Sequence, residues 1–393
     1  MTSLRFMFWT SAVLIVYSYI GYPFLLGFLS IFAKRKRSGK GDAFPPCTPE
    51  RKRPAFVTML ISVYNEEKVI EEKIRNTLEL EYPKDSLQVV VLSDGSTDRT
   101  HEIVRRHSKD GVVLLEYPGR IGKTACLNRT MPNVHGDIVV FSDANSIYPA
   151  DAVKNIVEGF SDPSVGFVTG YTKYRREGGN EGVRSIGLYS RIEKTTKALE
   201  SKIGSCVGAD GAIFGIRKEL YTPLKETDIN DLVIPLSIVR QGYRGILKED
   251  AHCIECSAGD IAGEYQRQVR ITNRSLRAIF SNADLFNPLN SGIFSFFLFS
   301  HKLMKFLVPF FLVGLFVSSI ALVDSGYIYT VTFVAECCLV AVVLGSRRRG
   351  KTVFTPKIFA LAGEFMMINA AVLQGWLKYM RNERYTTWSP NRR

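Results

Sequence analysis

Two apolar stretches that end in carboxylates decide the fold of this chain: VVVLSDGSTD at 89–98 and DIVVFSDAN at 137–145. Each apolar run has the length of a β-strand and ends in an aspartate with turn or cap residues. In an open α/β sheet, ligands bind in the crevice at the carboxyl ends of the strands. Two acidic strand ends therefore predict a site for a phosphate-bearing ligand and a metal ion, and oxygen side chains favour Mg²⁺ or Mn²⁺.

The sequence around these stretches alternates between strand-like and helix-like segments. Strands are expected at 55–63, 87–93, 112–115, 137–142 and 165–171, with helices between them. This alternation predicts an α/β fold with a mainly parallel sheet and helices on both faces. Residues 183–280 are less regular, with expected helices at 183–203, at 231–241 and after Gly263, and a glycine-rich stretch at 208–215.

Charged and apolar residues are unevenly distributed over the 393 residues. Charge is concentrated between Lys34 and Arg277, whereas both ends are strongly apolar. The net charge of +13 fits a membrane surface better than nucleic acid, because basic residues flank the apolar stretches. Neither an RNA-binding signature nor a zinc finger is present. The seven cysteines, including the CxxC at Cys253 and Cys256, indicate a reduced, cytosol-facing domain more than a redox or metal site.

The apolar ends predict a multi-pass protein of the cell membrane that contacts lipids. Residues 6–33 are uncharged, long enough to span a bilayer, and followed by KRKR at 34–37; their length and the lack of a cleavage site argue against a signal peptide. The basic residues place the following domain in the cytoplasm. Later apolar stretches are an interfacial segment at 293–303 and spans at 306–323 and 326–345, separated by a basic loop at 346–351 from a stretch at 358–377. That last stretch either spans the membrane, is re-entrant or packs on the other helices.

These features divide the chain into four expected regions. Residues 1–33 are an N-terminal transmembrane helix, and residues 34–54 are a basic, proline-rich linker. Residues 55–290 are a cytoplasmic α/β domain. Residues 291–393 are interfacial and transmembrane helices with a basic tail. Three or four spans are few for a transporter, so a partner subunit or a second copy of the chain is expected to complete any channel.

Several polar residues stand where the expected strands and helices meet. Tyr64, Asn65 and Glu66 follow the first strand, where they either cap a helix or contact a nucleotide. Lys123, in RIGKT at 120–124, precedes a helix and suits a phosphate group. The Walker phosphate-loop pattern G-x-x-x-x-G-K-[ST] would need a glycine at position 117, which is a tyrosine. The dinucleotide-binding fingerprint G-x-G-x-x-G is also missing.

Four arginines in the last expected helix of the α/β domain share one face. They are Arg267, Arg270, Arg274 and Arg277, spaced by three, four and three residues. One interpretation is a solvated or lipid-headgroup face. The other is that the first two clamp a departing diphosphate and the last two meet the membrane.

Residues 55–277 resemble the inverting family-2 glycosyltransferases of the GT-A fold. With the flanking spans, the chain is similar to the membrane-embedded polysaccharide synthases, which make cellulose, hyaluronan, chitin and poly-N-acetylglucosamine. The resemblance is carried, in order, by SVYNEE at 62–67, SDGSTD at 93–98, GKTACLN at 122–128, SDAN at 142–145, GADGAIF at 208–214, ND at 230–231 and the basic helix.

The resemblance implies roles for individual residues. Asp94 holds the nucleotide, Asp143 and Asn145 form the metal and diphosphate motif, and Asp231 is the general base. Arg270 stands on the arginine of the family's Q-x-x-R-W motif. The chain departs from the family where Asn145 and Asn230 replace acids, and where Arg267 and Ile271 replace the glutamine and tryptophan of that motif.

The sequence therefore predicts an inverting, hexosyltransferase-type enzyme that uses Mg²⁺ or Mn²⁺. It moves a sugar from a nucleotide-diphospho-sugar, expected to be a UDP-sugar, to a glycan or lipid-linked acceptor in cell-surface polysaccharide synthesis. One alternative is a single transfer to a lipid-linked acceptor, and another is a catalytically silent membrane scaffold, which retention of the aspartates disfavours. Asp210 and Asp228 compete with Asp231 as the base. The expected substrate contacts are Tyr64, Asn65, Glu66, Asp94, Lys123, Asp143, Asp210, Arg267 and Arg270.

Overall fold

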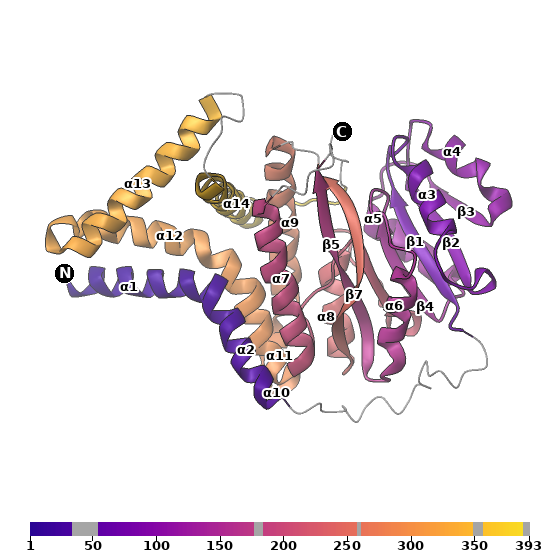
Figure 1. Cartoon of the computed structure of the whole chain (residues 1–393), viewed down its shortest axis with the longest axis horizontal. Coiled ribbons are helices and arrows are strands. Elements are labelled where there is room, and N and C mark those ends of the chain that lie inside the picture. The colour runs from indigo at the N-terminus through magenta and orange to yellow at the C-terminus, as the bar shows by residue number, and fades with distance from the viewer. Residues whose placement is uncertain (34–53, 177–183, 258–260, 349–356, 388–393) are drawn as a thin grey trace.

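The computed structural model describes residues 1–33, 54–176, 184–257, 261–348 and 357–387 (Figure 1). Residues 34–53 of the expected linker and residues 349–351 of the basic loop lie outside these residues. The catalytic region contains a seven-stranded sheet in the order β3-β2-β1-β4-β6-β5-β7. Its strands are β1 Val57–Val63, β2 Leu87–Asp94, β3 Val112–Tyr117, β4 Ile138–Asp143, β5 Val165–Arg176, β6 Ile213–Arg217 and β7 Arg244–Ser257.

Helices cover both faces of the sheet, which confirms the expected α/β fold (Figure 1). Strands β1 to β4 pair in parallel, as do β5 and β7. All seven residues of β1 are buried, and burying each large aliphatic side chain contributes about 1.5–3 kcal/mol. The helices are α3 Ile70–Leu78, α4 Thr100–Arg106, α5 Lys123–Thr130, α6 Ala152–Glu158, α7 Arg184–Ile203, α8 Asn230–Arg240 and α9 Ile261–Ser281.

Two strands were not predicted from the sequence. Strand β6 falls in the glycine-rich stretch and runs antiparallel to both β4 and β5. Strand β7 is interrupted by charged residues at 248–250, so it shows no continuous apolar run. Each of these strands pairs with one edge of β5. They form because of this pairing with a distant segment of the chain, which a local sequence pattern does not reveal.

The strand register brings the two acidic strand ends to one edge of the sheet. Ser62 of β1 pairs with Asp143 of β4, and Val63 of β1 pairs with Ser93 of β2, one residue before Asp94. The two aspartates therefore flank the carboxyl end of β1. Gly95 follows at φ +70°, and a Cβ there would lie 2.5 Å from the carbonyl oxygen of Gly119. The turn after β2 consequently requires glycine.

Within the described ranges, two apolar helices are long enough to cross a membrane: Thr2–Phe32 and Ile293–Ala321. Each bends at a π-helical segment, Tyr17–Gly21 in the first and Leu298–Leu303 in the second, which is a known cause of kinks. The bends lie side by side, since Tyr17 Oη and Ser300 Oγ are 2.8 Å apart. The component helices are α1 Thr2–Val16, α2 Tyr22–Phe32, α11 Ile293–Phe297 and α12 Met304–Ala321 (Figure 1).

The segment expected at the interface, 293–303, is thus the first part of one long helix and not a separate element. Helix α13, Tyr327–Arg348, contains a shorter apolar stretch, Tyr327–Ala341. Helix α14, Lys357–Met380, packs against α9, where a Cβ on Gly375 would lie 2.6 Å from Thr272 Cβ. Of the three alternatives for the last apolar stretch, this contact favours packing on the other helices.

Candidate active site

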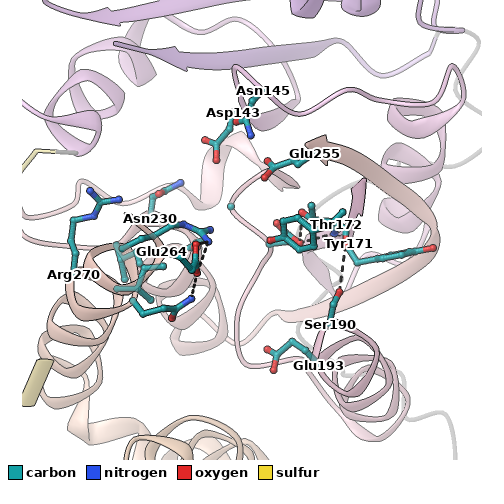
Figure 2. Close-up of a pocket in the computed structure, with 18 of the residues that line it drawn as sticks. Asp143, Asn145, Tyr171, Thr172, Ser190, Glu193, Asn230, Glu255, Glu264 and Arg270 are labelled. Carbon is teal, nitrogen blue, oxygen red and sulfur yellow. Dashed lines mark hydrogen bonds and ion pairs between the residues drawn. The ribbon is translucent and has the colours of Figure 1, made fainter. Parts of the chain in front are cut away.

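A cavity of about 460 Å³ opens at the carboxyl edge of the sheet. Figure 2 shows Asp143 and Asn145 at one end, Arg270 and Asn230 on one wall, Tyr171 and Thr172 on the other, and Glu193 at the opposite end. Residues from β4, β5, β7 and from helices α7, α8, α9 and α14 line it. Segments far apart in the sequence therefore enclose a single polar site.

Asp94 is fully buried at the end of β2, beside this edge. Its Oδ1 accepts a hydrogen bond of 2.9 Å from the backbone N–H of Gly122, and its Oδ2 lies 3.5 Å from Nε of Arg120. The Arg120 guanidinium in turn stacks on the ring of Tyr64, 3.2 Å from its centroid. Asp94, Arg120 and Tyr64 thus form one group next to the loop that leads into α5, an arrangement suited to a nucleotide base or ribose.

Asn65 connects the turn after β1 to the turn after β2. It has a left-handed backbone, with φ +52°, and its Oδ1 accepts a 2.7 Å hydrogen bond from the N–H of Thr97. Helix α3 begins five residues later, at Ile70, so Asn65 does not cap it. Glu66 is the member of this turn that lines the cavity.

Asp143 and Asn145 line the cavity, and Nζ of Lys123 lies 2.7 Å from Oδ1 of Asp143. Asp143 therefore forms an ion pair with Lys123, the first residue of α5. Among the described residues, no group of three or more histidine, cysteine or acidic side chains is placed to hold a metal. The oxygen donors still suit Mg²⁺ or Mn²⁺, which keep several ligands from water or phosphate.

Asp231 lies in the first turn of α8 and faces the cavity. Its backbone carbonyl accepts a 2.8 Å hydrogen bond from the N–H of Ala209, and a Cβ on Gly211 would lie 3.0 Å from its Oδ2. Its Oδ1 has no hydrogen-bond partner among the described residues. Burial raises the pKa of the Asp231 carboxyl, and the charge of Lys123 partly offsets this rise.

The two competing aspartates are engaged in other bonds. Asp210 lines the cavity, but its carboxylate accepts hydrogen bonds from the N–H and Oγ1 of Thr172, both 2.9 Å, and from the N–H of Ala212. Asp228 is buried, and its Oδ2 accepts a 2.8 Å hydrogen bond from the N–H of Lys225. Only Asp231 among the three combines access to the cavity with a carboxylate oxygen that has no hydrogen bond.

The arginines of α9 separate into two pairs. Arg267 and Arg270 line the cavity; Arg267 forms an ion pair of 3.2 Å with Glu264. Arg270 makes no hydrogen bond or ion pair with the part of the chain that the structure describes, and burial lowers the pKa of its guanidinium. Both guanidinium-bearing residues thus line the same cavity as Asp143.

The interpretation that the other two arginines meet the membrane is contradicted for Arg274. Arg274 is buried, and it donates to the carbonyl oxygens of Thr227 and Asp228 just before α8. Arg277 donates 2.8 Å to the carbonyl oxygen of Glu383, beyond the end of α14. Arg274 therefore fastens the loop before α8, where buried carbonyl groups need donors, and Arg277 joins α9 to the segment after α14.

We expect Arg274→Ala to lower the free energy of unfolding by about 1–3 kcal/mol, since two carbonyl groups would lose their donor. A matched control is Arg75→Ala, which removes an exposed i,i+4 pair with Glu71 and should cost less than about 0.5 kcal/mol. Urea unfolding of both variants measures the difference. Equal losses in the two variants would contradict this role for Arg274.

Sequence reasoning missed the walls of the cavity that come from α7, β7 and α14. They include Ser190, Glu193, Lys197, Glu255 and Glu364. No local motif marks these residues. An amphipathic helix with lysines and glutamates, such as α7, is the one signal that the sequence offered.

Comparisons with known proteins agree on the class. Residues 58–222 match the family model described as Glycosyl transferase family 2. Poly-beta-1,6-N-acetyl-D-glucosamine synthase of Staphylococcus aureus is 25% identical over 220 residues, covering 54% of this chain and 53% of that protein. Beta-monoglucosyldiacylglycerol synthase of Nostoc sp. is 32% identical over 117 residues, covering 29% of this chain and 25% of that protein. The chain thus spans about half or less of the length of these relatives.

The fold of the whole chain is similar to that of a solved structure. That structure is mannosyltransferase PcManGT from Pyrobaculum calidifontis in complex with GDP-Man and Mn²⁺, with a TM-score of 0.72 and 21% identity. The likeness covers 96% of this chain and 100% of that chain. The protein is therefore a glycosyltransferase of the GT-A fold. Its catalytic domain belongs to glycosyltransferase family 2 and is related to the polysaccharide synthases.

Proposed function

We propose that this glycosyltransferase moves a sugar from a nucleotide-diphospho-sugar to an acceptor hydroxyl with inversion, at the cytoplasmic face of a membrane. The observation that carries the proposal is the position of Asp231. Its half-buried carboxylate lines the same cavity as Asp143, Lys123 and Arg270. A base and a group of phosphate-binding side chains are thus assembled around one space.

In the proposed reaction, Asp231 accepts the proton of the acceptor hydroxyl. The acceptor oxygen attacks the anomeric carbon on the face opposite the nucleotide, and the bond to the diphosphate breaks. Lys123, Arg267 and Arg270 bind the departing diphosphate and stabilise its charge. A divalent cation held by Asp143 and Asn145 would neutralise the same phosphates when bound.

For the donor, we propose that Asp94 holds the nucleotide, with Tyr64 and Asn65 shaping its pocket and Glu66 and Asp210 on the cavity wall. A UDP-sugar is the first donor to test. GDP-mannose is the second, because the solved protein of similar fold was crystallised with GDP-Man and Mn²⁺. Incubating the purified protein with a panel of nucleotide-sugars and measuring the released nucleotide identifies the donor; no release with any of them would contradict the proposal.

For the acceptor, two proposals remain. Synthesis of a cell-surface polysaccharide is supported by the relation to the Staphylococcus aureus synthase. A single transfer to a lipid-linked acceptor is supported by Ile271, which stands in the cavity where the polymerising relatives have a tryptophan, and by the similarity to a diacylglycerol glycosyltransferase from Nostoc sp.. Sizing the products separates them, since a polymer gives a ladder and a single transfer gives one product.

The topology gives a further prediction: the catalytic domain faces the cytoplasm and the N-terminus lies outside. The reason is the basic cluster at 34–40. In a background without the exposed Cys256, Cys337 and Cys338, a membrane-impermeant thiol reagent should label Asp324→Cys on intact cells. It should label Lys154→Cys only after permeabilisation; both are exposed positions. Labelling of residue 154 on intact cells would reverse the orientation.

A further inference from the structure

The end of the cavity that lies opposite Asp143 in Figure 2 is formed by α7, which carries Glu193. Lys197 lines the cavity one helical turn further along α7. On this side α7 contacts α2 and side chains of the π-helical segment Leu298–Leu303. The membrane helices thus supply charged groups next to the cavity, and the function proposed above uses none of them.

Two carboxylates at this end of the cavity, Glu193 and Glu200, already accept hydrogen bonds from neighbouring side chains. His301 is fully buried, with Nδ1 2.8 Å from Oε1 of Glu200 and Nε2 2.9 Å from Oε2 of Glu193. Both ring nitrogens of His301 therefore face carboxylate oxygens. Lys305 donates to the same Oε2 of Glu193 at 2.9 Å, and Tyr22 donates to Oε1 of Glu200 at 2.7 Å.

Two lysines are left with incomplete pairing. Nζ of Lys302 is 3.5 Å and Nζ of Lys197 is 3.9 Å from Oε1 of Glu193. Neither ammonium group makes a hydrogen bond within the described ranges, although Lys197 is only 6% exposed. A buried ammonium group without hydrogen bonds is costly. This cost is relieved if an anion enters the cavity beside the lysines.

The balance of charge points the same way. Three lysines, Lys197, Lys302 and Lys305, surround the carboxylate of Glu193, whereas Glu200 is bonded by Tyr22 and His301. Such a corner attracts an anionic group, and phosphate offers several strong acceptor oxygens to lysine.

Lys302 also lies close to the backbone of the proposed base. A Cβ on Gly208 would be 3.5 Å from the carbonyl oxygen of Asp231 and 3.7 Å from Cε of Lys302. On the donor side, Lys123 of α5 pairs with Asp143. Asp231 therefore has donor-binding groups on one side and Lys197 with Lys302 on the other.

We propose that Lys197 and Lys302, here called the lysine pair, bind a phosphate group of the acceptor and so hold its hydroxyl beside Asp231. This inference rests on the proposed function and names the chemical class of its acceptor. The phosphate belongs either to a lipid headgroup or to a soluble phosphorylated glycan. Lys302 lies in an apolar helix long enough to span a membrane. A lipid headgroup and a soluble phosphorylated glycan can therefore both reach the site.

The test uses the purified full chain in uncharged detergent and isothermal titration calorimetry. The probes are dihexanoyl phosphatidic acid for a lipid phosphate, dihexanoyl phosphatidylcholine for a zwitterionic headgroup, and inorganic phosphate for a soluble source. Lys197→Gln and Lys302→Gln should each weaken binding of the phosphate probe at least about tenfold, the loss expected for a charged hydrogen bond. The matched control is Lys202→Gln, an exposed lysine of the same helix, which should bind like the unmodified chain.

Two further measurements keep the result decisive. The affinity for UDP with Mn²⁺ should not change in either lysine-pair variant, and Lys197→Arg should restore most of the phosphate binding if Lys197→Gln is unstable. Tighter binding of phosphatidic acid than of inorganic phosphate assigns a lipid source, and equal binding assigns a soluble one.

The proposal is overturned if no phosphate probe binds, if the glutamine variants bind as well as the control, or if they lose UDP and phosphate together. If the unmodified chain binds the phosphate probe but no nucleotide, the proposed transfer reaction fails while the anion site stands.

Discussion

Asp231→Asn is expected to lower turnover by at least about 10²-fold, and up to about 10⁴-fold, because a general base contributes that much to rate. The variant should bind nucleotide with near-normal affinity, since Asp94, Lys123 and Asp143 are unchanged. Its thermal stability should also stay near that of the unmodified protein, because the Oδ1 of Asp231 makes no hydrogen bond among the described residues. Steady-state kinetics, nucleotide titration and thermal unfolding measure these three quantities.

The control variants are Asp210→Asn and Asp228→Asn. Asp210 accepts hydrogen bonds from Thr172 and Ala212, and Asp228 accepts one from Lys225, so each of these changes should reduce stability more than Asp231→Asn does. If Asp231→Asn stays active and one of the other two is inactive with donor binding intact, the base has been assigned to the wrong aspartate.

The pH profile gives an independent check on the same residue. Burial raises the pKa of Asp231, and a base must be deprotonated to act. Turnover should therefore fall as the pH decreases through a value above the ordinary aspartate pKa. The residual activity of Asp231→Asn should lack this acid limb, and persistence of the limb in the variant would assign it to another group.

Removal of divalent cations is expected to abolish turnover, and added Mn²⁺ or Mg²⁺ should restore it. The departing diphosphate carries charge that Lys123, Arg267 and Arg270 only partly neutralise, and a bound cation supplies several kcal/mol of the remainder. Chelation followed by titration of each metal, with released nucleotide as the signal, measures the effect. Full activity in excess chelator would contradict a metal at Asp143 and Asn145.

Metal binding itself can be followed without turnover, by electron paramagnetic resonance of Mn²⁺ with UDP present. Asp143→Ala should abolish the bound signal, whereas Asn145→Asp should keep or tighten binding because it adds a carboxylate. Asp85→Ala, at an exposed position in the loop before β2, is the control and should bind Mn²⁺ normally. Loss of Mn²⁺ in Asn145→Asp would contradict the assignment of residue 145 as an oxygen ligand of the cation.

The sequence by itself determined the parallel part of the sheet and the two acidic strand ends. Strands β1, β2 and β4 are continuous apolar runs, and Asp94 and Asp143 terminate two of them. Such runs can be recognised from the local sequence, because a strand buried on both faces is built mainly from apolar residues. Neighbouring carboxyl ends in a parallel sheet then lie at one edge, so the sequence could also place these residues in one site.

The tertiary structure alone decided which polar side chains meet there. The resemblance favours Asp231 over Asp210 and Asp228 as the base, and the structure adds that the other two carboxylates accept hydrogen bonds from Thr172, Ala212 and Lys225. Arg274 was expected at the membrane but lies beneath the loop before α8.

The contact of Lys302 with Glu193 joins residues more than one hundred positions apart, and α14 reaches the cavity from near the end of the chain. Partners of this kind depend on how helices pack over the sheet. That packing is set by the shape of the whole core, and no local pattern of residues records it.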